Sequence, residues 1–279
     1  MRQIAFLFYY AMQWLAYYAR AKTIYNLQSP FLTELAQAVV EDRRRYYIFE
    51  WMKGLRQLFA KDKTIIEIND LGAPSQVWNS ARRTVSEIAR YNAVSPATGE
   101  TLFRLVNWLK PATMIELGAS LGVSAIYQSA AARRARFITV EGHAGLASIA
   151  RRSLSLAGLS GVEVENAPFS KILADHLPVL QPLDYLFIDG DHQYEPTIEY
   201  ILQCIPYAHE NSVFVLADIH WSKQMNRAWR HLQVLPEVSH TIDLFYVGLL
   251  FFRKGHAEQS HISLIRYRYK PWLVGVFGE

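Results

Sequence analysis

Five polar residues stand where buried, apolar segments of the chain end, and their types suit ligand binding. They are Glu116, Glu141, Asn166, Asp189 and Asp218. In open α/β sheets, ligands bind outside the carboxyl ends of the strands, where such side chains can reach them. Any one of these residues could instead cap a helix. The prediction of a site therefore depends on all five meeting at one edge of a sheet.

The turn within Met114 to Ser124, MIELGASLGVS, is the most informative stretch of the chain. Gly118 and Gly122 lie between an apolar strand and a helical run, an arrangement that lets a nucleotide-like ligand approach the backbone and the helix amides. The dinucleotide fingerprint G-x-G-x-x-G lacks its middle glycine here, which favours a cofactor without a pyrophosphate. Glu141, about 25 residues after Glu116, is placed to accept hydrogen bonds from ribose hydroxyls.

The elements that position these residues alternate between strand and helix, which predicts an α/β fold with a parallel sheet and helices on both faces. Residues 240–252 leave no room for a crossover helix and predict a closing antiparallel hairpin. The five expected parallel strands are Thr113 to Leu117, Arg136 to Val140, Val162 to Asn166, Asp184 to Ile188 and Ser212 to Leu216.

Three segments follow from this pattern: a helical extension or cap over residues 1–97, a Rossmann-like domain over 98–253, and a tail over 254–279. Ile4 to Tyr18 is apolar and aromatic but shorter than a spanning helix requires, which predicts a packed or interfacial helix and no membrane span. Thr64 to Ser75 predicts a connecting loop that can fold over a ligand. The tail is expected to form a further strand and an extended arm. The aromatic side chains of this arm are expected to pack on the N-terminal helices or on a second subunit of a homodimer.

Composition limits the class of protein. Of 279 residues, 51% are hydrophobic and 19% charged, which indicates a globular chain. The net charge of +4 comes from scattered basic clusters with no nucleic-acid-binding motif, so no nucleic-acid partner is expected. The single cysteine, Cys204, suits a helix core and a reducing, cytoplasmic location.

Four motifs together resemble the class I S-adenosylmethionine-dependent methyltransferases, in particular the small-molecule O-methyltransferase-like branch found in bacteria. The resemblance covers residues 98 to 253. Its motifs are ELGASLG from Glu116, VEG from Val140, FIDGDHQYE from Phe187 and LADIHWSKQM from Leu216.

The resemblance implies a role for each matching residue. The methionine part of the cofactor would be surrounded by Glu116, Gly118, Ala119, Ser120 and Gly122. Glu141 would hold the ribose, and Asn166 and Ala167 would lie near the adenine. Asp189 would sit beside the sulfonium and the acceptor.

Methyl transfer to a hydroxyl needs a group that takes up the proton of the acceptor. The candidates for catalysis are Asp189, His192 and His220. Metal-dependent relatives instead use a carboxylate after the fourth strand and an Asp-Asn pair after the fifth. This chain offers Asp189 and Asp218 as metal ligands, but Ile219 stands where the amide would be, and His220 would have to replace it.

The expected function is S-adenosylmethionine-dependent methyl transfer to a small-molecule acceptor, at oxygen. Two other classes stay open at this stage. One is a nicotinamide-dependent oxidoreductase, which the missing glycine disfavours. The other is a non-catalytic S-adenosylmethionine-binding or assembly protein whose N-terminal helices form its working surface. The identity of the acceptor is not encoded in any motif.

Overall fold

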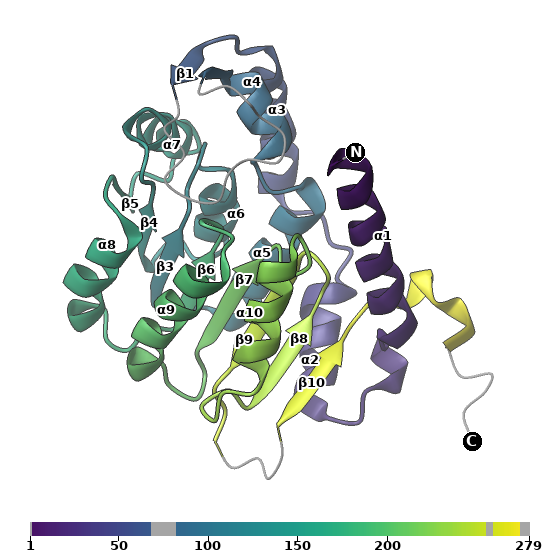
Figure 1. Cartoon of the computed structure of the whole chain (residues 1–279). Coiled ribbons are helices and arrows are strands. Elements are labelled where there is room, and N and C mark those ends of the chain that lie inside the picture. Colours follow the sequence, from purple (N-terminus) through teal and green to yellow (C-terminus); the bar gives the residue numbers. More distant parts are fainter. Residues whose placement is uncertain (1, 68–81, 255–258, 274–279) are drawn as a thin grey trace.

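A sheet of eight strands forms the centre of the molecule, with helices on both of its faces (Figure 1). The computed structural model describes residues 2–67, 82–254 and 259–273. The strands follow the order β10-β8-β9-β7-β6-β3-β4-β5. The chain therefore starts the parallel part of the sheet in its middle, at β3, and adds strands outward in both directions. Such a reversal of strand order is where open α/β sheets bind ligands.

Five strands run parallel, as the sequence predicts. They are β3 (Thr113–Leu117), β4 (Arg136–Val140), β5 (Val162–Glu165), β6 (Tyr185–Ile188) and β7 (Val213–Ala217). Every residue of β6 and β7 is buried, as expected for strands covered on both faces. Their carboxyl ends lie along one edge of the sheet, and the five predicted polar residues lie at or directly after these strand ends.

The hairpin predicted over residues 240–252 is also present. Strand β9 (Val247–Phe251) runs antiparallel to β7, and β8 (His240–Asp243) runs antiparallel to β9. The tail adds β10 (Ser260–Ser263), which pairs in parallel with β8. The tail strand thus extends the same sheet.

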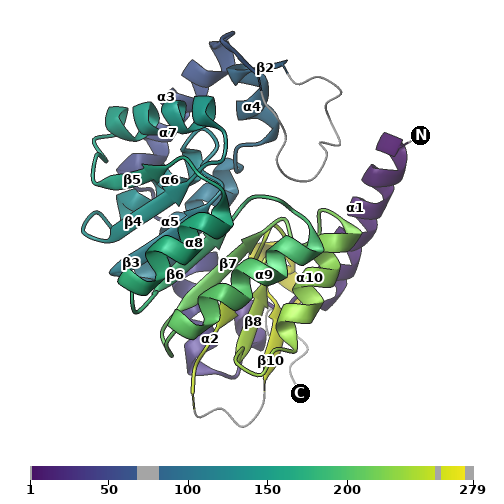
Figure 2. The same ribbon diagram turned by 60° about the vertical axis from the view of Figure 1, so that its left-hand side comes forward.

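Helices cover the two faces in separate groups. One face carries α2 (Pro30–Leu35), α3 (Tyr47–Lys61), α4 (Val85–Tyr91), α5 (Pro96–Leu109), α6 (Val123–Ala131) and α7 (Ala144–Leu156). The other face carries α8 (Phe169–His176), α9 (Tyr194–Cys204) and α10 (Lys223–Gln233) (Figure 2). Short helical turns occur at Ile24–Asn26, Ala36–Val40, Leu177–Val179, Ile205–Tyr207, Tyr267–Tyr269 and Pro271–Leu273.

Local signals in the sequence set several helix ends. Ser95 caps α5 by accepting a hydrogen bond from the Thr98 amide at 3.1 Å, and Pro96 occupies the first turn, where no amide donor is needed. Lys110 adopts a left-handed φ of 53° and ends α5 ahead of Pro111. Helix α5 therefore delivers the chain directly into β3, the first strand of the site.

The N-terminal region differs from expectation in one place. Residues 65–67 form a strand, β1 (Ile65–Glu67), which pairs with β2 (Arg82–Thr84) in a small antiparallel sheet. Part of the predicted loop is therefore extended, because the two segments supply each other with backbone hydrogen bonds. The Asp70 to Ser75 stretch lies outside the described residues.

Helix α1 (Arg2–Arg20) lies at the margin of the molecule, next to α10 and the hairpin (Figures 1 and 2). The hydroxyl of Tyr17 donates to the backbone carbonyl of Leu264 at 2.5 Å. The hydroxyl of Tyr18 donates to the backbone carbonyl of Tyr269 at 2.7 Å. The tail therefore packs on the N-terminal helix, which is one of the two arrangements expected for it. None of the described helices is long and apolar enough to cross a membrane.

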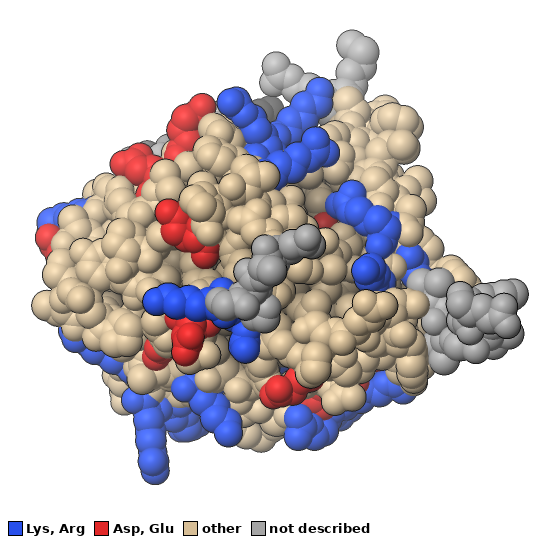
Figure 3. All heavy atoms as spheres, turned by 90° about the horizontal axis from the view of Figure 1, so that it is seen from below, with Lys and Arg blue, Asp and Glu red and all other residues tan. Residues whose placement is uncertain are grey.

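Charged side chains are mixed on the face seen from below (Figure 3). Lysine and arginine are scattered there among acidic side chains and wide uncharged areas. The net positive charge is therefore not gathered into one continuous basic surface on this face.

Candidate active site at the carboxyl edge of the sheet

The turn after β3 is strained and closely packed. Gly118 has a φ of +110° and Gly122 a φ of +80°, while Ser120 adopts +46°. The amides of Gly118 and Ala119 both donate to the carbonyl of Val140 at 2.9 Å, which ties the turn to the end of β4. Glycine is the residue that adopts such angles without penalty. The turn is thus held in one conformation before any ligand binds.

Gly118 also lies directly against the turn that follows β6. A side-chain Cβ at this position would collide with the backbone carbonyl of Asp189. The amide of Asp189 donates to the carbonyl of Leu117 at 2.8 Å. The expected cofactor turn and the expected acceptor turn are therefore in contact.

Glu141 joins the turn to the start of α7. One carboxylate oxygen accepts a hydrogen bond from the amide of Ser120, and the other from the amide of His143, both at 2.8 Å. Burial raises the pKa of Glu141, and the two backbone amides oppose this effect. Since a carboxylate has about four acceptor positions, both oxygens keep capacity for further donors. This is the position at which the sequence predicts a ribose contact.

Glu116 is placed differently from its sequence-based role. Its side chain is fully buried and accepts hydrogen bonds from Gln128 Nε2, at 2.8 Å, and from the hydroxyl of Thr139. Burial raises the pKa of Glu116 to about 7, against the effect of hydrogen bonds from Ser124, Thr139 and Gln128. Its carboxyl group braces β3 against α6 and β4, so it supports the turn from below.

Asn166 and Ala167 follow β5 at the same edge. The side-chain amide of Asn166 donates to the carbonyl of Glu141 at 2.7 Å, and the residue is exposed. Ala167 is half-buried against the apolar core under α8 and α9. Asn166 thus contacts the backbone of Glu141 across the edge of the sheet, and Ala167 follows it directly in the chain.

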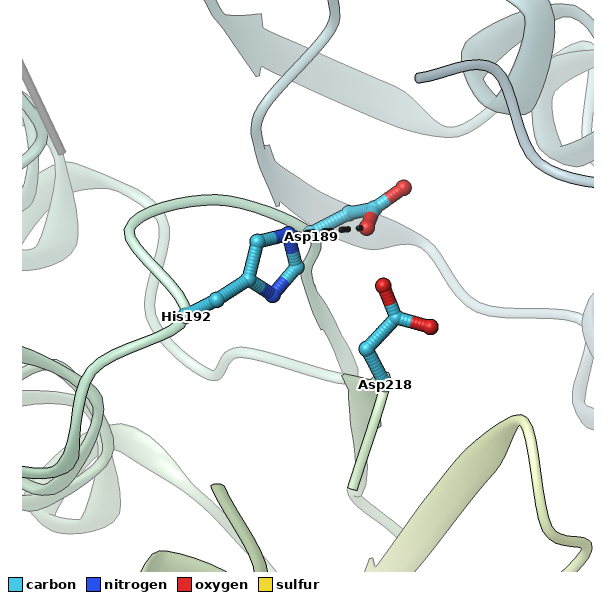
Figure 4. A group of neighbouring side chains, drawn as sticks. All are labelled: Asp189, His192 and Asp218. Carbon is cyan, nitrogen blue, oxygen red and sulfur yellow. Dashed lines mark ion pairs between the residues drawn. The ribbon is translucent and has the colours of Figure 1, made fainter. Parts of the chain in front are cut away.

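Asp189, His192 and Asp218 form a cluster at the ends of β6 and β7 (Figure 4). One ligand atom from each residue lies within 4.8 Å of the others. Nε2 of His192 is 3.8 Å from Oδ1 of Asp189, and the carboxylate of Asp218 points toward that of Asp189. Neither carboxylate accepts a hydrogen bond from another side chain or amide in the described part of the chain. The cluster thus holds a nitrogen base and two carboxylates with free acceptor capacity.

Electrostatics within the cluster raise the pKa of both carboxyl groups. Burial is the main cause that raises the pKa of Asp189, and the neighbouring Asp218 and Glu116 carboxylates add to it. Burial also raises the pKa of Asp218, while His192 opposes the shift. Asp191, His192 and Asp218 all adopt left-handed φ values of 61°, 42° and 54°. Strain of this kind is typical of functional turns.

The structure does not bring His220 into this cluster. Its Nε2 lies 2.9 Å from Oδ2 of Asp243, and its Nδ1 lies 3.1 Å from the side-chain amide of Asn226. The ring stacks on Phe245 and is 1% exposed. Both nitrogens are engaged in a buried network, so the predicted catalytic candidate His220 is set apart from Asp189 and His192.

Helix α1 packs beside Trp221 and Phe245, near the end of β7, and nothing in the sequence predicted this contact. Phe6 and Trp221 meet edge to face at 4.6 Å, and Tyr10 packs on Trp221 and Phe245. Burial raises the pKa of Tyr10, and the carboxylate of Asp218 contributes to the shift. The available signal was the aromatic content of residues 4–18, but nothing in that stretch specifies its partner.

The fold and this edge define a class of protein: a Rossmann-like sheet with a terminal antiparallel hairpin, a Gly-rich turn after the first strand and an acid after the second. Comparison with known proteins agrees. Residues 115–219 match the family model of a methyltransferase domain, a stretch that begins in β3 and ends just beyond Asp218. No curated protein matches the chain in sequence.

Solved structures share the fold at low sequence identity. The O-methyltransferase from Bacillus cereus, in complex with S-adenosylhomocysteine, superposes with a TM-score of 0.53 and 16% identity, over 78% of this chain and 95% of that one. Cofactor-bound Rv0187 from MTB gives 0.56 and 20%, over 82% and 100%. The O-methyltransferase TomG from Streptomyces achromogenes, in complex with S-adenosylmethionine, gives 0.54 and 17%, over 79% and 94%.

Residues 115–219 therefore match a methyltransferase domain, and the chain has the fold of solved methyltransferases.

Proposed function

We propose that this methyltransferase transfers the methyl group of S-adenosylmethionine to a hydroxyl oxygen of a small-molecule acceptor. The observation that carries the proposal is the direct contact between the Gly118 turn and the Asp189 turn, which supports a donor site next to His192 and two carboxylates. Two structures of the same fold are named as O-methyltransferases, which supports oxygen as the acceptor atom.

The donor side fits a nucleoside with an amino-acid part. S-adenosylmethionine supplies, when bound, a methyl group already activated by its sulfonium, so alignment does most of the catalytic work. We assign the ribose to the spare acceptor positions of Glu141 and the adenine to the vicinity of Asn166 and Ala167. The Ser120 hydroxyl is buried and has no hydrogen-bond partner in the described part of the chain, which supports its assignment, with Gly118, Ala119 and Gly122, to the methionine part.

On the acceptor side, we assign the general base to His192. Its side chain is 28% exposed, so an acceptor can reach it. Nε2 takes the hydroxyl proton as the oxygen forms a bond to the methyl carbon. The C–S bond breaks with its electron pair going to sulfur, which leaves neutral S-adenosylhomocysteine. Asp189, 3.8 Å from Nε2, then stabilises the imidazolium.

Asp189, His192 and Asp218 are also a group that could hold a divalent metal ion. An ion bound there would lower the pKa of the acceptor hydroxyl, and His192 would be a ligand rather than the base. Ile219, which stands where the metal-dependent relatives place an amide, is fully buried and offers no ligand. We therefore favour His192 as the base without a metal, and chelation decides between the two arrangements.

The remaining assignments concern the surroundings of the site. We assign the chemistry to residues 98–253 and the walls of the acceptor site to the extension over 1–97 and the tail over 254–279. The buried thiol of Cys204, whose pKa burial raises, is consistent with a reducing cytoplasm. A homodimer stays a prediction.

Two measurements test the function. Calorimetric titration of the purified chain with S-adenosylhomocysteine should give one site per chain, and Glu163→Gln, on the exposed side of β5, should leave that affinity unchanged. Formation of S-adenosylhomocysteine is then followed across a panel of phenols, catechols and aliphatic alcohols, with matched amines and thiols. Absence of cofactor binding to the folded protein overturns the proposal. Turnover of amines or thiols alone overturns the assignment to oxygen.

A further inference from the structure

The outer face of α1 is apolar along its whole length and has no partner in the described structure. At about 100° per residue, eight exposed residues fall on this face, and none has a polar side chain. Ile4, Phe8 and Leu15 are 74%, 69% and 53% exposed. The full set is Ile4, Ala5, Phe8, Ala11, Met12, Leu15, Ala16 and Ala19. An exposed apolar surface of this extent marks an interaction site.

The opposite face of α1 is fixed to the domain, so the helix cannot rotate to bury the apolar one. Phe6 contacts Trp221, Tyr10 contacts Phe245 at 5.1 Å, and Gln13 accepts a hydrogen bond from Asn226 at 3.5 Å. Lys270 reinforces the helix end by donating to the carbonyls of Ala19 and Ala21. Rotation about the helix axis would break all of these contacts.

Two of the elements that flank α1, helix α10 and the tail residues 267–273, are basic and carry no acid. Helix α10, which lies beside α1 (Figure 2), exposes Lys223, Arg227 and Arg230. Arg230 is close enough to Tyr9 of α1 to oppose the rise in the pKa of its hydroxyl that burial causes. The tail residues 267–273 expose Arg268. Neither 2–20, 223–233 nor 267–273 contains an aspartate or a glutamate.

Aromatic side chains border the same face toward the tail. Trp14 stacks on Tyr18 at 5.1 Å, and Tyr18 meets Trp272 at 6.2 Å. Trp14 and Trp272 are 40% and 54% exposed. Tryptophan and tyrosine favour the boundary between hydrocarbon and water, because an apolar ring and a polar edge are satisfied there together.

We propose that α1 docks this enzyme on an anionic lipid bilayer, lying in the plane of the interface with its outer face among the acyl chains. An apolar stripe bordered by basic and aromatic side chains is the arrangement that binds such surfaces. A second copy of the chain fits less well. It would bring another basic border to the same contact and no carboxylate on these elements to pair with it.

Vesicle sedimentation tests the proposal on the full chain. Vesicles of phosphatidylcholine with about 40% phosphatidylglycerol should bind the protein at least about tenfold more strongly than vesicles of phosphatidylcholine alone. Each basic residue near such a surface raises the partition coefficient about fivefold. The double variant Phe8→Ser and Leu15→Ser should lose about tenfold or more in partition to the anionic vesicles. The matched control Leu156→Ser and Leu202→Ser changes two exposed leucines on α7 and α9 and should bind like the parent.

A charge variant tests the basic border separately. Lys223→Gln with Arg230→Gln should lower the partition to anionic vesicles about 25-fold and leave the partition to neutral vesicles unchanged. Every changed side chain is exposed, so each variant should fold, and circular dichroism checks this. Equal binding of the parent and the Phe8 and Leu15 variant overturns the proposal. The proposal is also overturned if light scattering without lipid shows the parent as a dimer and this variant as a monomer, because the apolar face of α1 would then bind a second copy.

Discussion

The backbone carbonyl of Asp189 occupies the space in which a side chain on Gly118 would begin. This contact joins the turn after β3 to the turn after β6, and it fixes the distance between the proposed donor and acceptor sides of the site. Position 118 requires glycine for two reasons. Its φ is +110°, and the Asp189 backbone leaves no room for a side chain.

Gly118→Ala should therefore destabilise the protein by at least about 2 kcal/mol and abolish cofactor binding, because the strained φ and the backbone collision act together. Denaturant unfolding and calorimetry with S-adenosylhomocysteine measure the two effects. Gly54→Ala is the matched control. It lies inside α3 with open space around it, so alanine should stabilise the chain by about 0.5–1 kcal/mol. Normal cofactor binding by Gly118→Ala would contradict the placement of the donor in this turn.

Glu141→Gln tests the ribose contact. The substitution keeps the shape of the side chain but removes the charge that accepts from the Ser120 and His143 amides. A hydrogen bond to a charged group contributes about 1.5–3 kcal/mol, so the Kd for S-adenosylhomocysteine should rise about 10- to 100-fold. Glu163→Gln removes an exposed carboxylate from the neighbouring strand and should leave it unchanged. An unaltered Kd in Glu141→Gln would remove this residue from the cofactor site.

His192→Gln separates catalysis from cofactor binding. Loss of a general base lowers the rate about 10²- to 10⁴-fold, whereas the imidazole is assigned no contact with the cofactor. We expect kcat to fall in this range while the Kd for S-adenosylhomocysteine stays within about twofold. His176→Gln, on α8, is the control for loss of an imidazole elsewhere. Full activity in His192→Gln would leave the cluster without a base and refute the assignment.

Chelation addresses the metal alternative. Because Ile219 offers no ligand beside Asp218, we expect enzyme treated with EDTA to keep its kcat within about twofold in buffer freed of divalent ions. The measurement is repeated after adding Mg²⁺ or Mn²⁺. A loss of more than about tenfold on chelation, restored by the ion in the parent but not in Asp218→Asn, would instead make Asp189, His192 and Asp218 metal ligands.

The sequence allowed the parallel sheet and most of its edge to be predicted, for reasons that are local. Strands β6 and β7 are continuous apolar runs, β5 alternates valine with glutamate, and each of the five strands is followed by a polar residue or a glycine. The order of the strands and their carboxyl ends therefore follow from the sequence pattern. Asp189, His192 and Asp218 come together because adjacent parallel strands end at one edge. That convergence needs only the topology, which the alternation of strands and helices implies.

What could not be predicted depends on pairing between distant segments. His220 lies two residues after Asp218, so its position in the sequence made it a candidate ligand. In the structure its Nε2 instead lies 2.9 Å from Oδ2 of Asp243, in a buried network. Likewise, Tyr10 reaches the vicinity of Asp218 only because α1 packs against the β8–β9 turn. Neither partner is encoded near the residue that it affects. The direction of the Glu116 side chain was also not predicted. Its carboxyl group faces Gln128 and Thr139 beneath the turn.

The buried carboxyl group of Glu116 should make stability depend on pH. Its pKa is raised from 4.5 to about 7 in the folded chain. Between these values the folded protein keeps a proton that the unfolded chain releases, so the free energy of unfolding falls as pH rises from about 4.5 to about 7, and this contribution is constant above that. At 1.36 kcal/mol for each pKa unit, the total fall is about 3 kcal/mol. Glu116→Gln keeps the shape and an acceptor for Gln128 but cannot ionise. Urea unfolding of this variant at a series of pH values should show a slope reduced by this contribution, while the exposed-site control Glu163→Gln keeps the full slope of the parent. An unchanged slope in Glu116→Gln would mean that the carboxyl group is ionised in the folded protein and that β3 is braced against α6 by a charge.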